Sequence, residues 1–483
     1  MTPWRAAPLL VVTVFAVACA GEDPTPTLSD QIDAVFLSEL TDDGPGCALG
    51  VGRGDTTAFA RGYGLANLDH RIPITPQTVF DVGSVTKQFT AASTVLLAQD
   101  GALSLDDDIR DQLPELPDYE SPIRVRDLLQ HTSGVRDYLN LMALGGRDFY
   151  APIRHQDIVE LLARQQALVD PPGSRYRYSN TGYMLAATIV ERVSGQRFDQ
   201  FAEARIFGPL GMTASFLYED AEQVVPNRAT GYAPAGPDEA GFRMVHNYPF
   251  ATAGDGQLYT TVEDLLVWSR AFMADGVGGP EFTARMLSPG ELADGSRTEY
   301  GGGLVLGGYR GLTTQSHGGS TWGFRAHLVR VPEQGAAVAV LCNREDANPR
   351  RLANQVLDLI LTDALEPAEP TTPREPRPRP EPEPAAQVQL VAGDFDGSFY
   401  SEELDARYHL ALVDGALQAR IERWPALALE PLGEDRFRGV GFPAWTGPRQ
   451  VEFVFERSAR GAVIGFTLSA GTARGLEFAR VRS

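Results

Sequence analysis

The sequence has few of the residues on which metal sites and amine chemistry depend. It contains 3 cysteines, 7 histidines and, among its 42 basic residues, a single lysine, Lys87. The histidines form no HExxH pair, and the cysteines do not have the spacing of a zinc site. We therefore expect neither a metal nor another cofactor.

An excess of positive charge is also absent. With 63 acidic and 42 basic residues, the chain of 483 residues carries a formal net charge of −21. Nucleic acids and anionic membrane surfaces select clustered cations, so we expect neither as a partner. The composition, 43% hydrophobic and 22% charged, is typical of a soluble globular protein, and the length predicts two or more domains.

Long apolar runs are limited to one near the start. Residues 6–18 are apolar and follow one arginine, a run too short to cross a bilayer and typical of a signal peptide. We assign residues 1–18 to that peptide and residues 19–27 to a tether. Cys19 directly follows Ala-Val-Ala, which resembles a bacterial lipobox, so lipid anchoring at Cys19 is slightly favoured over plain secretion. We expect an exported protein of the periplasm or cell envelope.

Two further cysteines, Cys47 and Cys342, each lie in a strand-like apolar run. An exported compartment would permit a disulfide between them. Cysteine is also among the residue types most often buried, and we favour two buried thiols over a disulfide.

The near-absence of lysine makes Lys87 a candidate for proton transfer. A guanidinium keeps its proton in proteins, whereas a desolvated amine can lose it and act as a base. Lys87 lies in Ser84-Val-Thr-Lys87, at the head of an apolar stripe with helical spacing. We predict a helix from about Ser84, with the hydroxyl, the amine and unpaired first-turn N–H groups close together. This would supply a nucleophile, a base and half an oxyanion hole; a capping serine beside a chance lysine is the alternative.

A proline-rich segment divides the chain. Residues 366–386 alternate proline with charge and predict an extended linker. Residues 28–365 mix helical and strand periods, which predicts an α/β or α+β sandwich whose first and last strands share one sheet. Residues 387–483 contain two hairpin patterns, one turning at Asp414-Gly415, so we predict a small antiparallel β-barrel.

Individual elements of the large domain follow from the same periodicity. The predicted strands lie near 46–52, 57–65, 303–309, 323–331 and 336–342. The predicted helices lie near 84–100, 156–165, 181–195, 262–274 and 349–364.

Two further motifs accompany the Ser-x-x-Lys pair. Tyr178-Ser-Asn180 matches a Tyr-x-Asn pattern, and His317-Gly-Gly319 stands where Lys-Thr-Gly is common. In this order the motifs resemble the serine penicillin-recognising family of class C β-lactamases, D-alanyl-D-alanine carboxypeptidases, D-aminopeptidases and related esterases. The resemblance covers residues of about 45–345 and implies a β-lactamase/transpeptidase-like fold with an antiparallel sheet and a helical region. The tail resembles the small lipocalin-like barrels that some members append.

The resemblance implies a role for each motif residue. Ser84 would be the acylated nucleophile, with Lys87 and Tyr178 moving its proton. Asn180 would bind the substrate amide. The backbone N–H groups of Ser84 and Ser320 would form the oxyanion hole.

The third motif departs from the common pattern. His317 and Gly319 would contact the substrate, and His317 would orient it or polarise Tyr178. A histidine is only partly charged near pH 7, so a permanent cation is missing from this position. This disfavours a dedicated β-lactamase relative to peptide or ester hydrolysis.

Other stretches resemble the family without carrying chemistry themselves; they are residues 128–134, 206–212, 254–264 and 341–343. We expect His131 to pack a loop rather than to catalyse. The glycines at 301–303 are interpreted as a turn before a strand and not as a phosphate-binding loop, because no helix pattern follows them.

The sequence thus predicts an exported serine hydrolase acting through a Ser84 acyl-enzyme. It would cleave amide or ester bonds, above all those of D-amino-acid-containing peptides or of small amides and esters. A β-lactamase proper and a catalytically idle binding or scaffold lipoprotein are the alternatives. The partner is a small-molecule or peptide substrate, and a membrane is contacted only through the anchor at Cys19. The oligomeric state and the role of the barrel stay open.

Overall fold

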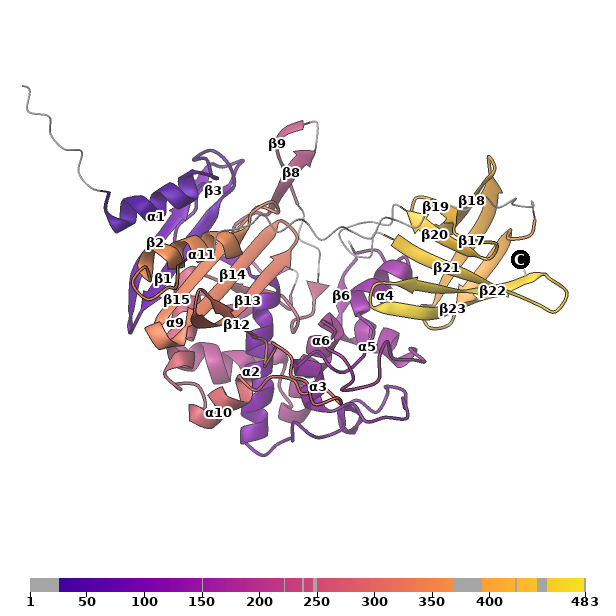
Figure 1. The fold of residues 1–483 in the computed structure, drawn as a ribbon, viewed down its shortest axis with the longest axis horizontal. Helices are drawn as coiled ribbons and strands as arrows, with labels where there is room; N and C mark the ends of the chain where they lie inside the picture. Colours follow the sequence, from indigo (N-terminus) through magenta and orange to yellow (C-terminus); the bar gives the residue numbers. More distant parts are fainter. Residues whose placement is uncertain are drawn as a thin grey trace, which may run out of the picture.

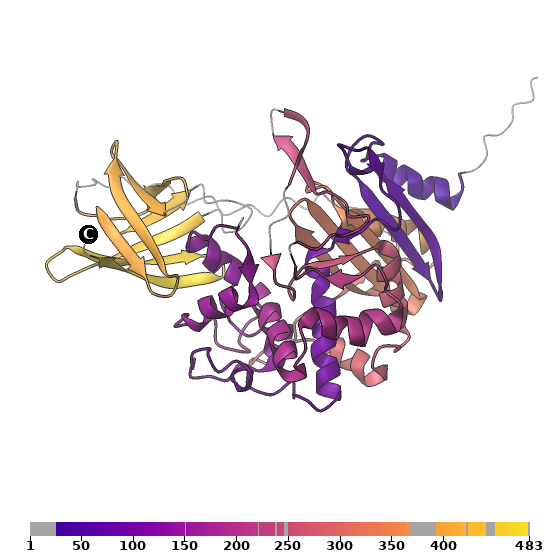
Figure 2. The ribbon, with the colours of Figure 1, turned by 180° about the vertical axis from the view of Figure 1, so that it is seen from behind.

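The computed structural model describes residues 26–149, 151–220, 222–236, 239–245, 250–367, 393–421, 424–440 and 450–481. The predicted signal peptide, Cys19 and most of the tether and linker lie outside the described residues. The described residues form an α/β domain and a β-barrel, which lie side by side in both views (Figure 1, Figure 2). None of the described helices is long and apolar enough to cross a membrane.

Six antiparallel strands form the main sheet of the α/β domain, in the order β12-β13-β14-β15-β1-β2. Their bounds are Val305–Tyr309, Leu312–Thr321, Phe324–Val331, Ala336–Cys342, Cys47–Arg53 and Thr56–Tyr63, in that order. Strand β1 pairs with β15 from Cys47 opposite Cys342 to Arg53 opposite Ala336. The prediction that the first and last strands share one sheet is confirmed.

Successive strand residues point to opposite sides of this sheet, so its apolar strands place apolar side chains on both faces. Helices cover both of these faces. On one face α11 (Pro349–Ile360) packs on β14 and β15, and α1 (Leu28–Leu37) packs on α11. Leu49 and Val51 of β1 belong to that apolar cluster. On the other face α9 (Val262–Met273) packs on β1 and β15 and joins the larger cluster of the helical region.

The helical region lies between the two halves of the sheet in sequence and below the sheet in Figure 1. Its helices are α2 (Lys87–Gln99), α3 (Val125–Leu129), α4 (Tyr138–Leu144), α5 (His155–Ala163), α6 (Asn180–Ser194), α7 (Phe198–Ala202), α8 (Gly208–Leu210) and α10 (Gly279–Met286). Short strands complete the domain: β3 (Leu65–Asn67), β4 (Ile72–Pro73), β5 (Phe80–Asp81), β6 (Ile153–Arg154), β7 (Phe216–Leu217), β8 (Tyr232–Gly236), β9 (Glu239–Met244), β10 (Phe250–Ala251) and β11 (Leu258–Thr260).

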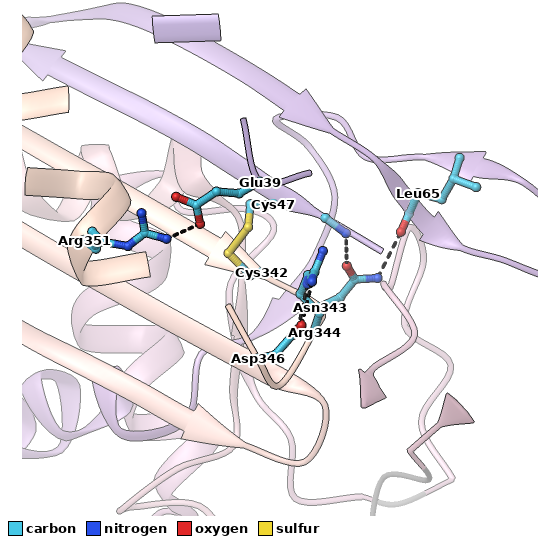
Figure 3. Close-up of a disulfide and its surroundings, with 9 residues drawn as sticks. Glu39, Cys47, Leu65, Cys342, Asn343, Arg344, Asp346 and Arg351 are labelled. Carbon is cyan, nitrogen blue, oxygen red and sulfur yellow. Dashed lines mark hydrogen bonds and ion pairs between the residues drawn. A yellow bond between two sulfur atoms is a disulfide. The ribbon is translucent and has the colours of Figure 1, made fainter. Parts of the chain in front are cut away.

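Cys47 and Cys342 form a disulfide, which corrects our preference for two free thiols (Figure 3). The two apolar runs pair directly, so the two cysteines face each other in register across β1 and β15. Beside the disulfide, the buried Asn343 side chain accepts a hydrogen bond from the Gly46 N–H at 2.8 Å and donates to the Leu65 carbonyl at 3.1 Å (Figure 3). Covalent and polar bonds thus tie the two ends of the domain together.

The tail is a closed barrel of eight antiparallel strands in sequence order, as expected. The strands are β16 (Gly397–Ser401), β17 (Ala406–Val413), β18 (Ala416–Ile421), β19 (Leu427–Pro431), β20 (Arg436–Val440), β21 (Gln450–Arg457), β22 (Val463–Ala470) and β23 (Ala473–Val481). Buried aromatic rings fill the interior, with Phe466 stacked on Phe478 at a centroid distance of 4.6 Å. Asp414-Gly415 forms the turn between β17 and β18, as the sequence pattern predicts.

The barrel contacts the α/β domain at the segment around α4 and α5 through a buried ion pair (Figure 1, Figure 2). Arg136, just before α4, binds Glu403 of the barrel, and their side chains are only 2% and 8% exposed. The Arg136 guanidinium also donates to the Arg474 carbonyl at 2.7 Å, and the Gln166 N–H donates to Glu403 at 2.8 Å. Both charges are therefore removed from water but remain hydrogen-bonded.

A second ion pair at the same contact allows a matched test. Arg164 and Asp405 also join the two domains, but their side chains are 41% and 59% exposed. We expect Glu403→Gln to lower the free energy of unfolding by about 3 kcal/mol, because it leaves the buried Arg136 charge without its counter-charge. Asp405→Asn should cost less than about 1 kcal/mol. Urea unfolding of the full chain measures both; equal losses would contradict the assigned role of the buried pair.

Candidate active site

Ser84 and Lys87 lie at a sharp entry into α2. Strand β5 ends at Asp81, whose buried carboxyl accepts a hydrogen bond from the Gly83 N–H at 2.9 Å. Gly83 has a φ of 50°, which glycine adopts without a steric penalty. The predicted α-helix from Ser84 begins instead as a 3₁₀ turn over Gly83–Thr86, and the α-helix follows from Lys87. The Thr86 hydroxyl donates to the Gly83 carbonyl at 2.6 Å, which stabilises this tighter turn.

The Lys87 amine is fully buried and has three hydrogen-bond acceptors. It lies 3.0 Å from Ser84 Oγ, 2.9 Å from Asn180 Oδ1 and 2.7 Å from the Asp255 carbonyl oxygen. These acceptors come from the helix entry, from the first residue of α6 and from the loop before β11. The structure thus brings the predicted nucleophile, base and amide together at one atom.

Tyr178 lies beside the same amine. Lys87 Nζ lies 4.9 Å from the centroid of the Tyr178 ring, over its face. On the other side the buried His131 ring packs against Tyr178 at a centroid distance of 4.2 Å. His131 Nδ1 accepts from the Ser179 N–H at 3.1 Å, and its carbonyl accepts from the Arg177 N–H at 2.7 Å. His131 therefore packs the loop that holds Tyr178, as expected from the sequence.

Strand β13 brings Gly319 and Ser320 against the helix entry. A Cβ atom at Gly319 would lie 1.9 Å from the Val82 carbonyl oxygen, and one at Gly83 would lie 2.9 Å from the Ser320 nitrogen. Only glycine fits such a close backbone approach. Ser84 and Ser320 consequently line one pocket, which is the arrangement that an oxyanion hole from their N–H groups requires.

His317 is neutral, contrary to the partly charged state that we expected. Burial, together with the positive charge of Lys87, lowers the pKa of His317 to about 4. Its Nδ1 lies 2.6 Å from the Gly318 carbonyl and its Nε2 lies 2.8 Å from the Tyr300 hydroxyl. Because a carbonyl only accepts, Nδ1 carries the proton and Nε2 accepts from Tyr300. His317 therefore bonds Tyr300 rather than Tyr178, whose ring lies 6.3 Å away between centroids.

A pocket of about 660 Å³ opens at these residues. It is lined by Gly83, Ser84, Tyr138, Leu139, Tyr178, Asn180, Thr252, Asp255, Gly256, Gln257, Ser320, Thr321, Trp322, Arg325 and Glu345. A neighbouring pocket of about 580 Å³ contains His317 and shares Ser84, Tyr178, Ser320 and Arg325 with it. Arg325 lies opposite Ser320 in the β13–β14 pairing, so a cation is present beside the site although His317 is neutral.

Three acidic residues near Lys87 escaped the sequence analysis. Burial raises the pKa of Asp81 to about 7, and it also raises the pKa of Asp137 and Asp255, while the Lys87 charge opposes the rise at the latter two. Asp137 accepts from the Asn180 N–H at 2.7 Å and so fixes the start of α6. Asp255 lies in the stretch 254–264 that we expected to carry no chemistry, and its backbone carbonyl accepts from Lys87.

The neutral state of His317 predicts how stability depends on pH. The folded state disfavours protonation, while the unfolded chain takes up a proton below a pH of about 6.5, so stability falls between about pH 6.5 and pH 4. Between pH 7 and pH 4, we expect the free energy of unfolding of His317→Gln to fall by about 3 kcal/mol less than that of the natural chain. Urea unfolding at both values measures this. Substitution of the exposed His70 by Gln is the control, and parallel curves for His317→Gln would contradict the argument.

The sequence matches the family described as Beta-lactamase over residues 34–362. The chain belongs to this family. A D-aminopeptidase of Gluconobacter oxydans (strain 621H) is 32% identical over 329 residues, which cover 68% of this chain and 61% of that relative. The chain thus spans less than two thirds of the length of this relative.

Two further proteins are similar to this chain. A D-aminopeptidase of Cereibacter sphaeroides (strain ATCC 17029 / ATH 2.4.9) is 26% identical over 504 residues, covering 91% of this chain and 96% of the relative. The solved structure of D-amino acid amidase from Ochrobactrum anthropi SV3, complexed with L-phenylalanine amide, has a TM-score of 0.59. It is 25% identical and covers 70% of this chain and 99% of that chain.

Proposed function

We propose that the protein is an exported serine hydrolase that cleaves amide bonds of small peptides or amino acid amides, with D-residues preferred. The main support for this proposal is that the buried Lys87 amine lies 3.0 Å from Ser84 Oγ, because this geometry pairs a nucleophile with a group that can take its proton. The names D-aminopeptidase and D-amino acid amidase support the substrate class.

The proposed reaction proceeds through an acyl-enzyme. Ser84 Oγ attacks the substrate carbonyl carbon while the Lys87 amine accepts the hydroxyl proton. The N–H groups of Ser84 and Ser320 stabilise the oxyanion. The carbon–nitrogen bond then breaks, and the leaving amine takes the proton from Lys87 with Tyr178 beside it. Water attacks the resulting ester, gives one proton to Lys87, and releases the acid as that proton returns to Ser84 Oγ.

Asn180 and His317 take positioning roles in this scheme. The Asn180 amide oxygen binds Lys87, which leaves its NH₂ group as a donor for the substrate carbonyl. His317 with Tyr300 supports the β13 segment that contains Gly319 and Ser320. A chromogenic cephalosporin and an aryl ester, tested beside D-amino acid amides, separate this proposal from a β-lactamase or an esterase.

Two substitutions test the mechanism. Ser84→Ala removes the nucleophile, and Lys87→Arg keeps the charge but cannot accept a proton, so we expect both to lower kcat at least 1,000-fold, roughly the effect of removing such a unit. Hydrolysis of D-alanine p-nitroanilide measures kcat, and labelling by a fluorophosphonate probe reports the nucleophile directly. Circular dichroism checks that each variant is folded. An active Lys87→Arg variant would refute the base role, and a natural chain that neither reacts nor labels would favour the idle scaffold.

Export and anchoring at Cys19 form part of the proposal. The Cys47–Cys342 disulfide supports export, because disulfides persist in oxidising compartments and are rare in the cytosol. We expect metabolic labelling with palmitate to mark the natural chain and to be lost in Cys19→Ser. An unlabelled natural chain found in the soluble exported fraction would refute the anchor and favour plain secretion.

A further inference from the structure

Asp255 lines the pocket that also contains Ser84, Tyr178 and Ser320. Its backbone carbonyl accepts from Lys87, the amine that also binds Ser84. Its two carboxylate oxygens lie 3.3 and 3.4 Å from the Tyr138 hydroxyl. Hydroxyl–carboxylate hydrogen bonds are normally about 2.5–2.7 Å long, so Tyr138 is a weak partner. The residue is partly exposed and lines the pocket.

The surroundings of Asp255 favour a cation. A negative charge on Asp137 raises the pKa of Asp255, and a negative charge on Asp255 raises the pKa of Asp81. These two neighbours therefore oppose ionisation of Asp255. A cationic group beside Asp255 would favour the ionised form of its carboxyl, because a nearby positive charge lowers the pKa that burial raises.

Covalent geometry sets where the ammonium group of an amino acid amide must lie. The α-nitrogen is two bonds from the scissile carbonyl carbon, at a distance of about 2.5 Å from standard bond lengths. Its counter-ion must therefore lie beside the nucleophile. Asp255 is placed for this role, because it lines the same pocket as Ser84 and its backbone carbonyl accepts from the amine that also binds Ser84. Glu345, another acid of the pocket, instead accepts from the Gly323 N–H at 3.1 Å, beyond Ser320 on the chain.

We propose that the Asp255 carboxylate binds the free α-ammonium group of the residue whose carbonyl Ser84 attacks. The enzyme then selects substrates with an unblocked amino group over N-acylated ones. This inference rests on the proposed function, because it assumes attack by Ser84. In this proposal, Asp255 is the residue that makes the enzyme prefer substrates with a free amino group to N-blocked ones.

The test compares D-alanine p-nitroanilide with N-acetyl-D-alanine p-nitroanilide at one pH. The measured quantity is the ratio of the two kcat/KM values. We expect Asp255→Asn to lower this ratio at least tenfold, and Asp255→Glu, which keeps the charge, to recover part of it. Glu345→Gln is the matched control, since it removes an acid from the same pocket, and its ratio should stay within twofold of the natural chain.

The outcomes separate this inference from the proposed function. If the natural chain cleaves both substrates and its ratio is unchanged in a folded Asp255→Asn variant, the role of Asp255 is refuted and Ser84 chemistry stands. A fall of equal size in Glu345→Gln would also refute it, because the effect would then reflect the net charge of the pocket. If neither substrate is cleaved and the fluorophosphonate probe does not label Ser84, the proposed function itself fails.

Discussion

The whole site depends on burying one amine. Removing an amine from water is costly unless its protons are hydrogen-bonded. Lys87 meets this requirement with Ser84, Asn180 and the Asp255 carbonyl, which come from three separate segments. Satisfying one nitrogen atom therefore fixes the relative positions of α2, α6 and the loop before β11. The same bonds hold the nucleophile, so packing and chemistry impose a common constraint.

Sequence periodicity and motif spacing predicted the features that depend on residues close together in the chain. Alternating and helical periods located five of the six strands of the main sheet, all except β13, together with α2, α5, α6, α9 and α11. The spacing of Ser84 and Lys87 placed both on one turn. The α-helix start was displaced to Lys87 because Gly83 and Thr86 form a 3₁₀ turn, which periodicity does not distinguish. Long-range effects were not predictable in this way. The disulfide requires the register of β1 against β15, and the neutral state of His317 requires its burial.

The barrel bears on the site although none of its described residues lines the two pockets at Ser84. Arg136 is held by Glu403, and Asn140 of α4 donates to Thr472 of the barrel at 2.6 Å. Between these anchors lie Tyr138 and Leu139, which form part of the pocket wall. The barrel thus holds both ends of a segment that forms part of the pocket wall.

The solitary and fully buried lysine also determines the chemical character of the molecular surface. Since Lys87 is the single lysine of the sequence and has no exposed area, the folded protein presents no lysine side chain to solvent. Reagents that acylate or cross-link lysine amines find no such target on the exterior, and trypsin has only arginine sites there. Amine-directed chemistry on a lysine side chain can occur only at the candidate active site, so a covalent reagent aimed at that amine would have no competing lysine on the surface.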